Sequence, residues 1–247
     1  MALAHRVIPT LLCRGRQLIK GERFASWRSV GVAAQAVRIH QARGVDELML
    51  LDIAATAEQR GPDLALVREL SDACFMPLAV GGGVRSVEDA RALLEAGADK
   101  VVVGTGGPRV IYDIAKRVGC QAVAASVDVR DGVAWVQSGT MRTGMPALQW
   151  AKECAYHGAG ELVLTSIDRE GTLQGYDIEL VRAVADAVDV PVIAHGGAGT
   201  YEHMLEAIRA GASAVAAGAM FQFTDATPAG AARYLQENGI EARINNG

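Results

Sequence analysis

The stretch AVGGGVRSVEDARALLEAGADKVVVGT at residues 79–105 recurs in altered form as IAHGGAGTYEHMLEAIRAGASAVAAGA at residues 193–219. The two copies lie 114 residues apart, and the same offset aligns residues further upstream. The identical pairs are Gly82 with Gly196, Gly83 with Gly197, Glu88 with Glu202, Gly97 with Gly211, and Leu66-Val67-Arg68 with Leu180-Val181-Arg182. Chance coincidence in a chain rich in Gly and Ala is the alternative, but the identical Leu-Val-Arg run argues against it. Self-similarity of this kind indicates that one half of the chain duplicates the other.

Short apolar runs alternate with amphipathic segments along the whole chain. The runs are mostly unbroken, as expected of parallel strands that are covered on both faces. The predicted strands cover residues 6–12, 47–53, 75–80, 100–105, 122–128, 161–167, 190–195 and 214–218. Eight strands alternating with helices indicate a single (β/α)8 barrel, or TIM barrel, over residues 1–247, built from two half-barrels. A doubly wound open sheet is the alternative, and the repeat favours the barrel.

Composition excludes several classes of protein. The formal net charge of −4 offers no bulk attraction to nucleic acid or to anionic membranes. No apolar run approaches the roughly 20 residues of a membrane helix, and we find no signal peptide. The four cysteines are far apart and lack the Cys-x-x-Cys spacing of metal sites. We therefore expect a cytoplasmic protein with no metal, no cofactor, and no nucleic-acid or membrane partner.

Glycine clusters follow the predicted strands at equivalent places in the two halves. They are Gly81-Gly82-Gly83 after the third strand, Gly104-Thr105 after the fourth, Gly196-Gly197-Ala198-Gly199 after the seventh and Gly218-Ala219 after the eighth. Glycines let backbone N–H groups approach an anion closely, and the following helix N-terminus adds positive potential. The duplicated element therefore predicts two opposed phosphate sites, suited to a ligand with a phosphate at each end. The alternative is that these glycines only form tight strand-to-helix turns.

Several segments resemble, in order and spacing, the cyclase subunit of imidazole glycerol phosphate synthase over nearly the whole chain. The segments are RVIPTLL, DELMLLDI, GGGVRS, GADKVVV, GAGELVLTSIDREGT, GYD and IAHGGAG. The resemblance implies a barrel of two half-barrels with two phosphate grips, which binds a phosphorylated small molecule. It also implies a glutaminase partner on the opposite face, whose ammonia passes through the barrel core.

The chemistry implied by the resemblance uses one carboxylate at the end of the first strand and another at the end of the fifth. Asp128 matches the fifth-strand position, and we predict that it is catalytic, with a structural carboxylate that caps a βα loop as the alternative. Leu12 stands in the first-strand position. Leucine cannot transfer a proton, and the next residue, Cys13, points to the other side of a strand. The sequence therefore leaves open whether the chain is a cyclase or only an ammonia-channelling subunit.

At the other end of the barrel, the resemblance implies a ring of four charged residues that gates the ammonia tunnel. The matching residues, all of unchanged charge type, are Arg6, Glu47, Lys100 and Glu161. Such a ring is desolvated at a cost and is a poor source of stability alone. The alternative is ordinary solvated charges at strand ends. Asp99 matches a residue that docks the glutaminase, and we expect it on the same face.

Other residues complete the predicted binding face. Lys20 follows the first strand in a loop that we expect to close over a phosphate, with a solvated surface lysine as the alternative. Asp52 and Asp168 end the second and sixth strands, and His195 stands where the family usually has Ser. The residues predicted to bind substrate or phosphate are Lys20, Asp52, Gly82, Gly83, Gly104, Thr105, Asp168, Glu170, Gly171, Gly196, Gly197, Gly218 and Ala219.

A kept tunnel with a changed active face resembles a paralogous branch of the family in surface-polysaccharide pathways. In that branch the barrel and a glutaminase supply ammonia to an ATP-using enzyme that turns a sugar acetamido group into an acetamidino group. The segments CFMPL, GTLQGYD and SAVAAGAMF agree with it. We therefore predict an ammonia-conducting subunit for that modification. The cyclase of histidine biosynthesis is the alternative, and a non-catalytic scaffold that activates a glutaminase is a third reading.

Overall fold

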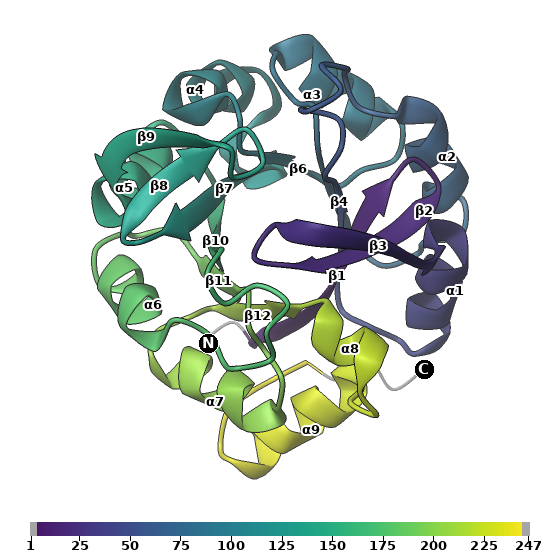
Figure 1. Ribbon diagram of the computed structural model, residues 1–247, viewed down its shortest axis with the longest axis vertical. Helices are drawn as coiled ribbons and strands as arrows, with labels where there is room; N and C mark the ends of the chain where they lie inside the picture. Colours follow the sequence, from purple (N-terminus) through teal and green to yellow (C-terminus); the bar gives the residue numbers. More distant parts are fainter. Residues whose placement is uncertain (1–3, 244–247) are drawn as a thin grey trace.

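The computed structural model describes residues 4–243. Within this range, eight parallel strands close into a barrel that is surrounded by helices, as Figure 1 shows. In barrel order the strands are β1 (Arg6–Arg14), β4 (Leu48–Asp52), β5 (Leu78–Gly81), β6 (Lys100–Val103), β7 (Val123–Arg130), β10 (Glu161–Ser166), β11 (Val192–His195) and β12 (Ala214–Ala217). The last strand pairs with the first, which closes the ring and confirms the predicted barrel.

The helices cover the outside of the barrel and begin at caps that follow the repeat. They are α1 (Ala33–Ala42), α2 (Leu64–Ser71), α3 (Val87–Glu95), α4 (Gly107–Val118), α5 (Ala147–Tyr156), α6 (Ile178–Ala185), α7 (Tyr201–Arg209), α8 (Ala219–Phe223) and α9 (Pro228–Glu237), with a 3-10 turn η1 (Cys120–Ala122). Asp63 and Asp177 cap α2 and α6, and Ser86 and Thr200 cap α3 and α7. Each side chain accepts a backbone N–H of the first turn, so equivalent helices start in the same way.

Two β-hairpins lie at the carboxyl ends of the barrel strands and were not predicted. One consists of β2 (Gln17–Glu22) and β3 (Ala25–Val32) after β1, and the other of β8 (Val133–Val136) and β9 (Met141–Pro146) after β7. In Figure 1 the β2–β3 hairpin crosses in front of the barrel centre. Because β1 and β7 start the two half-barrels, the hairpins occupy equivalent places in the repeat.

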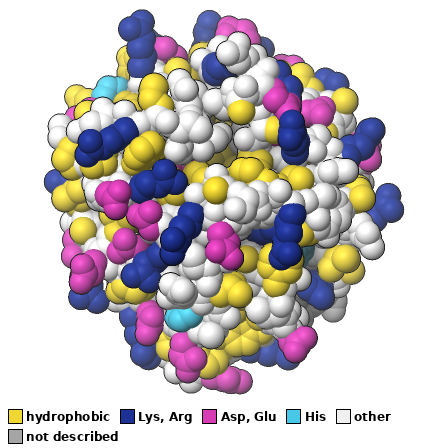
Figure 2. Space-filling model, in the orientation of Figure 1, with side chains coloured by type: hydrophobic (Ala, Val, Ile, Leu, Met, Phe, Trp, Pro, Cys, Tyr) yellow, Lys and Arg dark blue, Asp and Glu magenta, His cyan; other side chains and the backbone are white. Residues whose placement is uncertain are grey.

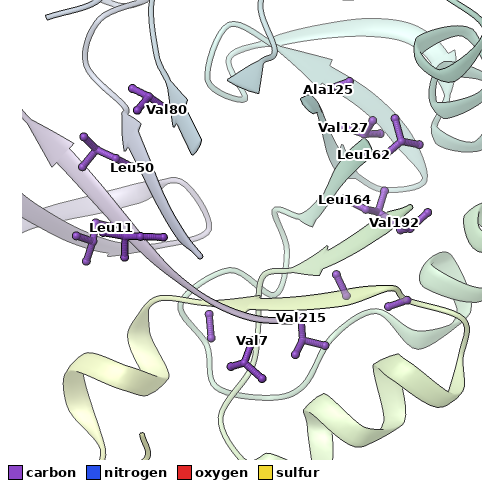
Figure 3. Close-up of a cluster of buried hydrophobic side chains, with 14 of the residues drawn as sticks. Val7, Leu11, Leu50, Val80, Ala125, Val127, Leu162, Leu164, Val192 and Val215 are labelled. Atoms are coloured by element: carbon purple, nitrogen blue, oxygen red, sulfur yellow. The ribbon is translucent and has the colours of Figure 1, made fainter. Parts of the chain in front are cut away.

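Side chains of the barrel strands divide into an outer and an inner set. Figure 3 shows the outer set, in which residues such as Leu11, Leu50 and Leu164 pack in the main core cluster with the surrounding helices. The inner set forms a separate apolar layer across the barrel axis: Ile8, Met49, Ala79, Val102, Ala124, Val163, Ile193, Ala214 and Ala216. This division follows from the two-residue period of a strand, which sends successive side chains to opposite faces.

No helix in residues 4–243 combines the length and the apolar character needed to cross a membrane.

The inner layer generates the first prediction. Ile193 is fully buried in it, so replacing Ile193 by Ala leaves a cavity on the barrel axis. We expect Ile193→Ala to lower the free energy of unfolding by about 2–5 kcal/mol, measured by urea denaturation. Ile39→Ala, at a 43% exposed position of α1, is the matched control and should change it by less than about 0.5 kcal/mol. Equal losses in the two variants would contradict the proposed inner layer.

Candidate functional site

A cavity of about 220 Å³ opens at the carboxyl ends of the barrel strands. Leu12 and Leu51 contribute to its wall, and Phe24 and Trp27 of the β2–β3 hairpin cover part of its mouth. Figure 2 views this face and shows hydrophobic side chains near its centre, with Lys, Arg, Asp and Glu around them. The predicted site residues that line the cavity are Asp52, Gly82, Gly83, Gly104, Thr105 and Asp128. This is the end of a barrel at which ligand sites are built.

Asp128 is a half-buried carboxyl group on β7 that faces the cavity. Burial raises its pKa to about 6, although hydrogen bonds from Ser126 and Thr165 act in the opposite direction. The Ser126 hydroxyl donates to Asp128 Oδ1 over 2.9 Å. A carboxyl group with a pKa close to neutrality can both accept and return a proton under physiological conditions. The position and pKa of Asp128 therefore suit an acid/base group.

Leu12 occupies the place in the first half-barrel that Asp128 occupies in the second. It faces the cavity and is only 4% exposed, while Cys13 lies in the outer core. Burial raises the pKa of the Cys13 thiol to about 12, so that thiol stays protonated. The prediction that Cys13 points away from the active face is confirmed, and no carboxylate stands on β1 at this height.

The glycine cluster after β5 borders the cavity, and its shape is dictated by close packing against β4. Gly82 has a φ of +112°, and a Cβ there would lie 2.4 Å from the backbone oxygen of Asp52. The Asp52 carboxylate accepts the backbone N–H groups of Ala54 and Ala55, and its other oxygen lies 2.7 Å from Arg60 Nη1. Asp52 therefore orders the loop after β4. Arg60 was not predicted, because no pattern in the sequence connects it with this aspartate.

The second glycine cluster does not border the cavity. Of the residues described, those predicted for ligand binding but absent from the cavity lining are Lys20, Asp168, Glu170, Gly171, Gly196, Gly197, Gly218 and Ala219. Gly197 has a φ of +104°, and a Cβ there would lie 2.2 Å from the backbone oxygen of Gly175. Close packing therefore requires glycine at this position even without a ligand.

Lys20 lies beside this second cluster, and its predicted setting is corrected. It belongs to strand β2 rather than to a loop, and it is only 1% exposed, so the alternative of a solvated lysine is wrong. A Cβ built at Gly218 would lie 2.0 Å from Lys20 Nζ, so the ammonium group sits where Gly218 leaves room. Burial lowers the pKa of Lys20, and the nearby Glu170 opposes that effect.

The β2–β3 hairpin is held on the loop after β10, which contains Asp168, Glu170 and Gly171. The backbone N–H of Arg23 donates to the Glu170 carbonyl over 2.9 Å, and Arg23 Nε donates to the Asp168 carbonyl over 3.1 Å. A Cβ at Gly171 would lie 2.3 Å from the backbone oxygen of Gly21. The hairpin and this loop are therefore in direct contact.

At the opposite end of the barrel, the four predicted gate residues form a closed ring of ion pairs. Arg6 lies 2.5 Å from Glu47 and 2.9 Å from Glu161, and Lys100 lies 3.1 Å and 2.8 Å from the same two carboxylates. The Glu47 and Glu161 side chains are 4% and 8% exposed. Burial alone would lower the pKa of Arg6, and the two carboxylates raise it overall. The alternative of separately solvated charges is therefore wrong.

Asp99 lies beside the ring, immediately before Lys100. Its carboxylate accepts the backbone N–H of Leu78 over 2.8 Å, and its own N–H donates to the Leu78 carbonyl over 2.9 Å. Asp99 thus fixes the start of β5 on the face that carries the ring. Its docking role stays a prediction.

The chain is similar to known proteins over nearly its whole length. The sequence model of a family described as "Histidine biosynthesis protein" matches residues 6–227. The chain is 44% identical over 253 residues to "Imidazole glycerol phosphate synthase subunit HisF" of Pyrobaculum aerophilum. That alignment covers 99% of this chain and 100% of the relative.

The raised pKa of Asp128 generates a prediction for stability. A pKa of about 6, above the value of about 3.9 for a solvated Asp, means that the folded state binds this proton more tightly. Stability from the protonated group is therefore present at low pH and lost as the pH rises from about 4 to about 6. At pH 8 we expect Asp128→Asn to be about 2–3 kcal/mol more stable than wild type, and this advantage should vanish near pH 4.

Urea denaturation at the two pH values measures this difference. Ile39→Ala, at an exposed position without a titratable group, is the control and should have the same effect at both pH values. An Asp128→Asn variant that is less stable than wild type at pH 8 would show that the carboxylate is satisfied when ionised.

Proposed function

The chain belongs to the histidine biosynthesis protein family, and we propose that it is the barrel subunit of a glutamine-dependent imidazole glycerol phosphate synthase. In this proposal a glutaminase docks on the face that carries the charged ring, and its ammonia crosses the barrel to the cavity. There the ammonia reacts with a phosphorylated precursor. The full-length relative favours this reaction over the sugar modification predicted from the sequence. The ring of Arg6, Glu47, Lys100 and Glu161 is the structural observation that carries the proposal.

The position of the ring and the free-energy cost of burying its charges both support a role in ammonia transfer. Four charged side chains taken out of water are a poor way to gain stability, so their meeting on the barrel axis argues for a functional role. Each carboxylate is shared between Arg6 and Lys100, which closes the opening in this structure. In our proposal the docked glutaminase opens it by displacing one of the cations.

The layer above the ring supports transfer of a neutral molecule. Ile8 and Met49 belong to this layer, which separates the ring from the cavity. Along β1 the path from Arg6 through Ile8 to Leu12 covers six residues, or about 20 Å. An ammonium ion would lose its hydration there at high cost, whereas uncharged ammonia loses much less. The layer would therefore pass the nucleophilic form of ammonia and retain the charged one.

The cavity supports acid/base chemistry on a phosphorylated ligand. Asp128 supplies a carboxyl group whose pKa is about 6, and the backbone of Gly82 and Gly83 lies at the rim near Thr105. In our proposal these glycines and Thr105 bind one phosphate of the precursor. A second phosphate would bind beside Gly218, with Lys20 of the β2–β3 hairpin as its cation.

A second candidate function is supported by Leu12. The side chain at this position is a buried hydrocarbon, and the resemblance implies a carboxylate there for ring closure. A subunit that only conducts ammonia to a sugar-modifying, ATP-using enzyme has no need for this group. The acetamidino-sugar pathway is therefore the alternative to the cyclase.

The first functional prediction concerns the ring. In the complex with its glutaminase, we expect Lys100→Met to lower the product formed per glutamine hydrolysed about tenfold, because ammonia no longer meets an intact gate. A tenfold change corresponds to ~1.4 kcal/mol. The rate with added ammonium salt should change much less, since that ammonia need not pass the ring.

Lys152→Met, at an exposed position of α5, is the matched control and should change neither rate. If Lys100→Met lowers the glutamine-driven and ammonium-driven rates by the same factor, the ring serves the fold and not the transfer of ammonia.

A second functional prediction separates the two candidate reactions. With ammonium salt and the histidine-pathway precursor, the wild-type chain should form imidazole glycerol phosphate, and Asp128→Asn should lower this rate by about 10²–10⁴-fold. Leu12→Asp should change the rate by less than about tenfold, because the existing groups already perform the proton transfers.

The control for Leu12→Asp is Leu12→Asn, because an asparagine side chain has about the size of an aspartate side chain but carries no charge. No product from wild type, together with clear product from Leu12→Asp but not from Leu12→Asn, would favour the sugar-modifying pathway.

A further inference from the structure

Each half-barrel places three residues from adjacent strands at the same height of the cavity wall, and the two sets differ in chemistry. In the first half, Leu12 pairs with Leu51 and Leu51 with Gly81 on adjacent strands. In the second half, Asp128 pairs with Thr165 and Thr165 with His195 in the same register. All six residues line the cavity. One half thus offers two hydrocarbons and a glycine where the other offers a carboxyl, a hydroxyl and an imidazole.

The members of the polar trio are neighbours on adjacent strands. Thr165 Oγ lies 3.1 Å from His195 Nδ1. Asp128 is the register partner of Thr165 on β7, and the Thr165 hydroxyl lowers the pKa of this carboxyl group. A hydroxyl group has one proton to donate, so it can donate to only one of these two neighbours at a time. When it donates to Asp128, it accepts from His195 Nδ1–H, and when it donates to Nδ1, the imidazole proton must be on Nε2.

We propose that Asp128, Thr165 and His195 form a proton relay, in which His195 Nε2 is the second proton-handling group of the cavity and stands in for the missing first-strand carboxylate. For its substrate this inference rests on the proposed function, but the relay itself does not. His195 takes the place in its half-barrel that Gly81 holds in the other half.

One transfer balances as follows. His195 Nε2 accepts a proton from the ligand, and Nδ1 gives its proton to Thr165 Oγ. The original hydroxyl proton of Thr165 passes to the Asp128 carboxylate. The ligand has lost one proton, Asp128 has gained one, and Thr165 and His195 are again neutral. In the reverse sequence, His195 Nε2–H returns a proton to the ligand and Asp128 loses the proton that it had stored. The same relay can therefore act first as a base and then as an acid.

Burial of both groups, together with the charge of Lys20, keeps the stored proton on Asp128 and not on His195. Burial lowers the pKa of His195 to about 3, and Lys20 on β2 adds to that effect, while Glu170 faces Lys20. Across the cavity Asp52 is paired with Arg60. Burial raises the pKa of Asp128 to about 6. The imidazole is therefore neutral near pH 7, and only its tautomer responds when Asp128 binds a proton.

The test reads this tautomer directly by NMR of protein labelled with ¹⁵N-histidine, without ligand or partner. We expect the His195 proton to be on Nδ1 above about pH 6 and on Nε2 below it, with a midpoint equal to the pKa of Asp128. Thr165→Val should abolish the change, and Asp128→Asn should fix the Nε2–H form. Thr165→Ser retains the hydroxyl and should retain the change. His195→Gln identifies the signal among those of the five histidines.

Activity provides the second readout. With ammonium salt and the histidine-pathway precursor, His195→Gln and Thr165→Val should lower kcat by about 10²–10⁴-fold, and Thr165→Ser should retain most of it. A pH-independent His195 tautomer between pH 5 and pH 7.5, or unchanged kcat in both His195→Gln and Thr165→Val, overturns the relay. If wild type forms no product but the tautomer changes as expected, the relay stands and the proposed function fails.

Discussion

Closure of eight parallel strands into a barrel is the constraint from which the other features of this molecule follow. Because side chains alternate along a strand, closure sends every second residue of each strand to one shared axis. Residues far apart in the sequence therefore form successive layers along the barrel axis. The ring from Arg6 to Glu161 lies at the base, the apolar layer around Met49 and Ile193 follows, and the cavity with Asp128 is above them.

The two half-barrels remain alike at positions that packing constrains, and they differ at positions that face the cavity. Helix caps recur at equivalent places, as with Asp63 and Asp177. The inward positions at the mouth differ instead, because a side chain that faces a cavity is not held by tight packing. At the paired inward positions, Asp128 and Thr165 of the second half are polar. The equivalent residues of the first half, Leu12 and Leu51, are apolar.

The barrel and the charged ring could be predicted from the sequence, but the hairpin at the mouth of the cavity could not. Unbroken apolar runs and the internal repeat are strong signals, so all eight barrel strands could be predicted. The β2–β3 hairpin could not, because its turn places Arg23 and Phe24 at φ values of 52° and 59°. Tight hairpin turns of this kind are usually marked by Asn-Gly or Asp-Gly. Consequently the burial of Lys20, which belongs to that hairpin, also escaped prediction.

Contacts between distant polar groups were the other limit. Arg60 pairs with Asp52, and Thr165 connects Asp128 with His195, through side-chain geometry that no local pattern encodes. Residue identity alone marked Leu12 as unusual but said nothing of what replaces a carboxylate. The register of β7, β10 and β11 supplies that information, since it puts three polar side chains at one height.

The ring of four ion pairs is itself electroneutral, since its two cations and two anions cancel. Alternating charges of this kind have little field beyond roughly one Debye length, about 8 Å at physiological salt. The ring itself then neither attracts nor repels ions in the surrounding solvent at long range. Access to the axis is decided by contact alone, so a molecule delivered at close quarters has the advantage over anything diffusing from bulk.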